Sequence, residues 1–144
     1  MKKTNNKGFS LVELIIVIAI MAILIGVLAP QYIKYVERSR VSSDKDMIDS
    51  LTKAAQTAVT DDDYYDDING GDNITISSSG VVVSGTGLTN AVTEFYGSVA
   101  NNKFKSKAFK SVTITINITQ DATTNTLKVQ VNDGSGTYDP SNYK

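Results

Sequence analysis

Hydrophobic residues are concentrated in one long run near the N-terminus of the chain. From Leu14 to Pro30 the sequence contains no charged residue and a single glycine, Gly26. Residues 9–30 would extend about 33 Å as an α-helix, at about 1.5 Å per residue. The hydrocarbon core of a bilayer is about 30 Å thick, so this segment is long enough to span a membrane.

A second pattern begins after Pro30, where apolar residues recur mostly at steps of three or four. They are Ile33, Val36, Val41, Ile48, Leu51, Ala55 and Ala58, with charged residues on the other faces. This pattern predicts an amphipathic helix. Joined to the apolar run, it would form one helix over residues 9–60, and two helices hinged at Pro30 are the alternative.

Gly26 and Pro30 mark the weakest part of this helix. Proline has no N–H to donate, and its ring clashes with the preceding turn. Kinks in long helices usually occur at such positions. We therefore expect a helix break between Gly26 and Pro30 in an assembled state, even where the isolated chain keeps the segment straight.

The C-terminal half changes to an alternation of apolar and polar residues. Residues 112–118 and 127–131 alternate on either side of a polar loop, which predicts an antiparallel hairpin. Two shorter strands are predicted at residues 74–76 and 81–83, and a short helix at 88–99 between the strand pairs. The predicted fold class is α+β, with a long N-terminal helix packed against a small antiparallel sheet.

Composition narrows the possible chemistry. The 144-residue chain has no histidine and no cysteine, and its formal net charge is -1. Disulfides, thiolate chemistry and the usual transition-metal ligands are thereby excluded. The sequence shows no nucleophile–base pair, metal cluster or phosphate-binding loop, so we expect no catalytic residue, no cofactor and no metal site. The charge balance argues against a nucleic acid partner.

Two polar segments leave alternatives open. Residues 61–67 contain five carboxylates and are predicted to form an exposed loop, with a calcium site as the alternative. Residues 103–110 contain four lysines with Phe104 and Phe109 between them. We interpret this segment as a solvated connection, with DNA binding as the alternative.

An ionisable residue, Glu13, lies just inside the start of the apolar run. A carboxylate near the bilayer interior costs about 2.5–3.5 kcal/mol on insertion scales, so such residues usually mark function or pairing. The alternative is that Glu13 lies shallow and reaches the membrane interface. A secretory signal peptide is disfavoured because Ala29–Pro30 is a poor cleavage site.

A basic leader, residues 1–8, is followed by Phe9, a polar residue, two apolar residues, Glu13 and the apolar helix. This order of residues resembles the processing motif of type IV prepilins and their pseudopilin relatives. The resemblance implies cleavage between Gly8 and Phe9 by prepilin peptidase, and N-methylation of Phe9. It also implies that Phe9 and Glu13 act in subunit assembly, through a pair between Glu13 and the Phe9 amine of a neighbouring subunit.

The same resemblance implies a division of the chain and a function. Residues 1–8 would be the cleaved leader, 9–30 the transmembrane and fibre-core helix, and 31–144 the extracytoplasmic head. The chain would be a structural subunit of a type IV pilus, serving adhesion, aggregation or twitching motility. It would form a homopolymer with other pilin subunits at an inner-membrane assembly platform.

The resemblance also implies a location and leaves one alternative within the family. Before assembly the chain would be a single-pass membrane protein with a cytoplasmic N-terminus, and afterwards part of an extracellular fibre. The lack of a cysteine pair resembles Gram-positive major pilins without a disulfide. The alternative is a pseudopilin of a type II secretion or DNA-uptake (competence) system.

Overall fold

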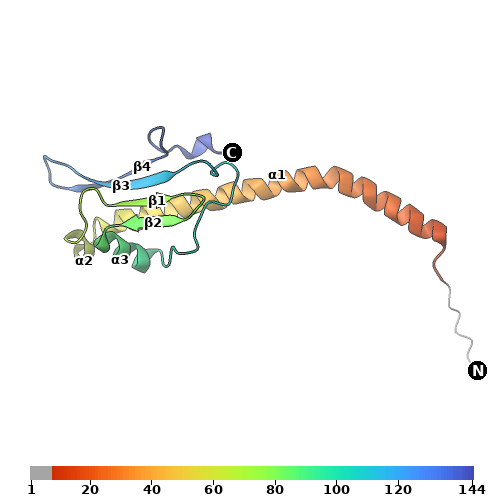
Figure 1. Cartoon of the computed structure of the whole chain (residues 1–144), viewed down its shortest axis with the longest axis horizontal. Coiled ribbons are helices and arrows are strands. Elements are labelled where there is room, and N and C mark those ends of the chain that lie inside the picture. The colour runs from red at the N-terminus through yellow and green to blue at the C-terminus, as the bar shows by residue number, and fades with distance from the viewer. Residues whose placement is uncertain (1–7) are drawn as a thin grey trace, which may run out of the picture. The chain divides into compact units, whose positions relative to one another are not determined.

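The computed structural model describes residues 8–144 and has an α+β fold, as expected (Figure 1). Most of the predicted leader, residues 1–7, lies outside the described residues. The chain divides into two compact units, Met1–Val36 and Glu37–Lys144. Helix α1, Leu11–Ala58, contains the boundary between them.

The first unit contains the apolar part of α1. Every residue from 8 to 35 is exposed, and Phe9 is 95% exposed. The helix is long and apolar enough to cross a membrane. It is continuous through Gly26 and Pro30, so the alternative of two separate helices is wrong for the single chain. Pro30 thus lies inside one helix, although proline removes one helical hydrogen bond and its ring clashes with the preceding turn.

The second unit begins with the amphipathic part of α1. Its buried residues are Val41, Asp44, Ile48, Leu51, Ala54, Ala55 and Ala58. The steps of three and four confirm the predicted helical face from Val41 onward. Ile33 was expected on the same face but is 62% exposed, because the buried stripe starts only in the second unit.

A four-stranded antiparallel sheet forms the rest of the core. The strands are β1 (Asn73–Ile76), β2 (Val81–Ser84), β3 (Ile114–Gln120) and β4 (Leu127–Asn132), in the order β2-β1-β3-β4. The predicted hairpin is confirmed as β3 and β4. The two shorter predicted strands pair with each other as β1 and β2, and β1 also pairs with β3. The inward isoleucines of β1 and β3 are fully buried in one cluster with Ile48 and Leu51 of α1.

Two helices complete the second unit. Helix α3, Thr86–Phe95, confirms a helix between the strand pairs, although it ends at Phe95 and not at residue 99 as predicted. It buries Leu88, Ala91 and Val92. Residues 61–67 were expected to form a loop, but they contain the short helix α2, Asp62–Tyr65. The side chain of Asp61 accepts a hydrogen bond from the Asp63 N–H at 3.0 Å, and this N-cap allows one helical turn to form.

Aromatic side chains hold the C-terminal segment, which includes the 3-10 helix η1, Pro140–Asn142. The Phe109 ring stacks on Tyr143 at 4.4 Å between centroids and on Phe104 at 4.8 Å. The Tyr143 hydroxyl donates a hydrogen bond to Asp133 at 2.8 Å. Stacking and hydrogen bonds therefore hold the C-terminal segment in the second unit, in a chain that has no cysteine to form a disulfide.

Candidate functional site

The beginning of α1 is built as a capping box. The Ser10 hydroxyl oxygen accepts a hydrogen bond from the Val12 N–H at 3.3 Å. In return the Glu13 carboxylate accepts one from the Ser10 N–H at 2.8 Å. This reciprocal arrangement satisfies two backbone donors that a helix start otherwise leaves unpaired. Glu13 therefore has a partner within its own chain, which the sequence interpretation missed because it considered only a neighbouring subunit or water.

The residues at the predicted cleavage site precede this helix. Gly8 and Phe9 are exposed and lie in neither a helix nor a strand. A Cβ added to Gly8 would meet no described atom within 4 Å, so the backbone there is open. Exposed irregular backbone is where proteolysis concentrates. The local structure is compatible with cleavage between Gly8 and Phe9, which stays a prediction.

Gly26 and Pro30 lie within α1 in the single chain. The expected break concerns an assembled state, so the continuous helix of the single chain does not test it. We expect a fibre map to show lost helical hydrogen bonds between Gly26 and Pro30. Unbroken helical hydrogen bonding from Ile25 to Gln31 in such a map would contradict the prediction.

Asp44 is a buried carboxylate that the sequence interpretation overlooked. It is 2% exposed and lies on the apolar face of α1. Its carboxylate accepts hydrogen bonds from the backbone N–H groups of Lys105, at 3.0 Å, and Ser106, at 2.8 Å. The Ser106 hydroxyl donates a further hydrogen bond to Asp44 at 2.6 Å. Such donors offset the cost of burying the charge.

These contacts explain the position of the lysine-rich segment. Asp44 fixes the backbone at residues 105 and 106, and Glu37 accepts a hydrogen bond from the Lys107 N–H. Phe104 is 5% exposed and Phe109 is 0% exposed. The segment is thus anchored to α1 rather than being only a solvated connection. Its two aromatic rings lie in the core, where they cannot stack on bases.

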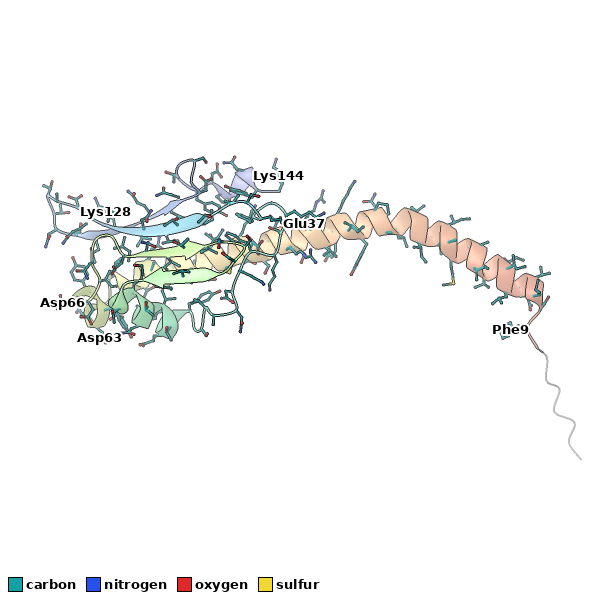
Figure 2. All side chains as sticks on the ribbon, viewed as in Figure 1. Phe9, Glu37, Asp63, Asp66, Lys128 and Lys144 are labelled. Carbon is teal, nitrogen blue, oxygen red and sulfur yellow. The ribbon has the colours of Figure 1, made fainter. Side chains whose placement is uncertain are left out.

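The carboxylates of residues 61–67 do not converge. Among residues 8–144, the structure brings together no group of three or more acidic side chains that could hold a metal ion. Asp61 instead caps α2, and Tyr64 donates a hydrogen bond to Glu94. Asp63 and Asp66 are exposed at one end of the second unit (Figure 2).

Comparisons with known proteins match the N-terminal region. Residues 3–29 match the family model described as the prokaryotic N-terminal methylation motif. The chain is similar to the type IV major pilin protein PilA of Myxococcus xanthus, with 39% identity over 63 residues, 44% of this chain and 29% of that protein. It is also 42% identical to the type IV major fimbrial protein FimA of Dichelobacter nodosus over 59 residues, 41% of this chain and 38% of that protein.

A third relative extends the similarity beyond the first helix. The fimbrial protein EcpC of Eikenella corrodens is 34% identical over 98 residues, which are 65% of this chain and 64% of that protein. The aligned region spans 29% of the PilA relative and 38% of the FimA relative. No solved structure matches the chain.

Proposed function

By its N-terminal methylation motif, its pilin relatives and its α+β fold, the chain belongs to the type IV pilin family, and from this premise we propose that it is a structural subunit of a surface pilus. The named relatives are major pilins and fimbrial proteins, which favours a pilus over the pseudopilin alternative. Adhesion, aggregation and twitching motility are the roles proposed for the fibre.

The observation that carries this proposal is the exposed apolar surface of α1. All residues from 8 to 35 are exposed in the single chain, including an uninterrupted apolar stretch. A large apolar surface of this kind needs a membrane or protein partner. Lipid supplies the partner before assembly, and the same helices of other copies supply it in a fibre core.

The proposed maturation follows the motif. Prepilin peptidase cuts between Gly8 and Phe9, which removes the leader, residues 1–8, and leaves the apolar helix on the chain. Phe9 is then N-methylated. Residues 9–30 anchor the subunit in the membrane with its N-terminus in the cytoplasm, and residues 31–144 form the extracytoplasmic head. At the assembly platform, the Glu13 carboxylate pairs with the Phe9 amine of a neighbouring subunit. The chain acts as a building block and not as an enzyme.

The mature N-terminus tests this proposal. Material sheared from cells that express the chain should contain it as a form beginning at Phe9 with one added N-methyl group. Peptide mass spectrometry of the sheared fraction measures both features. An intact Met1 in assembled material, or a new terminus at or after Pro30, would overturn the proposed processing, because the leader or the anchor would then be in the wrong place.

A further inference from the structure

A basic hollow of about 420 Å³ lies beside the first turns of α1 in the second unit. It is lined by Arg38, Val41, Ser42, Lys45, Tyr143 and Lys144. Arg38 and Lys45 are seven residues apart, so they lie on the same face of the helix. Val41 is 4% exposed and supplies an apolar floor. The hollow therefore combines two cations on a fixed helix with a partly apolar base.

The cations of the basic hollow have no strong partner nearby. Over the described part of the chain the only ion pairs are Arg40–Glu37 and Lys128–Asp121, so Arg38 and Lys45 take part in none. Asp139 is an acidic residue near Lys45, and its pKa is held below its usual range. Hydrogen bonds from Ser141 are the main cause, and the charge of Lys45 contributes least. The positive charge of the hollow thus remains available to a partner.

The opposite charge gathers at the far end of the same unit. Residues 61–67 carry five carboxylates, and neither ion pair found within residues 8–144 includes any of them. The pKa of Tyr64 is raised to about 12, first by its hydrogen bond to Glu94 and then by desolvation. The negative charges of Glu94, Asp61 and Asp63 raise it further. Figure 2 shows Asp63 and Asp66 at one end of this unit and Lys144 at the other.

We propose that the acidic segment of one copy, residues 61–67, docks against the basic hollow of a second copy in the fibre. The two surfaces lie at opposite ends of one compact unit, so they meet only between chains. A head-to-tail contact between different surfaces builds a filament when the rotation between successive copies does not close a ring. This inference rests on the proposed pilus function, and it assigns the heads a specific contact in addition to helix packing.

The structure favours a second copy over an anionic lipid as the occupant. Every subunit of a homopolymer brings one basic hollow and one acidic segment, so the two are present in equal numbers. Subunits already joined through their helices hold these surfaces at a high effective concentration.

Charge reversal tests the proposed contact in the full-length chain. The hollow variant carries Arg38→Glu and Lys45→Glu, and the segment variant carries Asp63→Lys and Asp66→Lys. Each juxtaposes like charges, so each should give at least about tenfold fewer surface fibres than wild type. The control, Lys103→Glu with Lys110→Glu, makes the same charge change at exposed lysines outside the hollow. It should leave the fibre count within about twofold of wild type.

Two combinations decide whether the surfaces contact each other. A chain that carries all four reversals has the wild-type net charge, and it should regain fibres because its surfaces are again complementary. Co-expression of the hollow and segment variants should also restore fibres that contain both chains, since each reversed surface then finds its complement on the other. Fibres are counted by electron microscopy, and immunoblots of membranes show that each chain accumulates.

The outcomes separate this inference from the proposed function. Reduced fibres in both variants, with recovery in either combination, support the contact. Normal fibres in both variants overturn it while leaving the pilus function intact. Loss in the hollow variant without recovery in either combination also overturns it, and indicates another anion, such as a lipid headgroup, as the occupant. Absence of wild-type fibres overturns the proposed function and, with it, the contact.

Discussion

Replacing Glu13 with alanine is expected to abolish surface fibres while leaving the head folded. In the proposed fibre core the carboxylate is the counter-charge of a neighbouring Phe9 amine. Removing it leaves that amine buried and unpaired, which costs about 3–5 kcal/mol if the pair is dry. Glu13 belongs to the unit Met1–Val36, whereas the hydrophobic core lies within Glu37–Lys144. The substitution should therefore affect assembly and not the stability of the head.

The capping box supplies a control for this experiment. Glu13→Gln removes the charge but keeps an acceptor for the Ser10 N–H, and glutamine also serves in capping boxes. Loss of the cap alone costs only about 1 kcal/mol. If the charge is what matters, Glu13→Gln and Glu13→Ala should both lack fibres. Fibre counts are compared after immunoblots confirm that each processed chain accumulates in the membrane.

Either of two results would contradict the proposed role of Glu13. Normal fibres with Glu13→Gln and few with Glu13→Ala would make Glu13 a helix cap rather than a counter-charge. Normal fibres with both variants as the only subunit would show that the carboxylate has neither role in assembly.

Replacing Asp44 with alanine is expected to destabilise the head by about 3 kcal/mol, because buried N–H donors left without an acceptor cost about 1–3 kcal/mol each. The donors are the backbone N–H groups of Lys105 and Ser106 and the Ser106 hydroxyl, all bonded to Asp44. For a domain of this size that loss lowers the Tm by roughly 10 °C or more. Thermal melts of the detergent-solubilised chain, followed by the near-ultraviolet circular dichroism of its tyrosines, measure the effect.

Asp46 provides the matched control for Asp44. It lies on the same helix and is exposed, so Asp46→Ala should change the free energy of unfolding by no more than about 0.5 kcal/mol. Equal melting temperatures for Asp44→Ala and wild type would show that the loop at residues 105 and 106 is held by other contacts. The Asp44 carboxylate would then have no major part in stabilising the head.

The main elements of the fold could be predicted because their periodicities are strong. Steps of three and four residues identified α1, and strict alternation identified β3 and β4. The pairing of β1 with β3 could not be predicted, since it joins segments far apart in the sequence and leaves no local pattern. Helix α2 was missed because its four residues are too short to show a period, and its cap at Asp61 was not considered.

The candidate site shows the same division between local and distant effects. The capping box could have been found in the sequence, because Ser10 precedes Glu13 by the required three residues. Asp44 carried a signal as well, since it occupies an apolar position in the series Val41, Ile48 and Leu51. Its partners at residues 105 and 106 could not be predicted, because only the tertiary fold brings that loop to α1.

The pairing of Glu13 with Phe9 of another copy depends on a second chain. The local pattern specifies the capping box within one chain. It does not specify how a neighbouring helix is placed beside it. The proposed pair therefore rests on the resemblance to pilins and on the need of a buried carboxylate for a partner.

A map of fibres sheared from cells, obtained by electron cryomicroscopy, tests the central claim most directly. We predict a helical fibre built from repeated copies of this chain, with residues 9–30 packed together in the core and the sheet-bearing heads on the outside. A fibre built from a different protein, or this chain found only as separate membrane-anchored subunits in cells that make fibres, would contradict the claim that it is a pilus subunit.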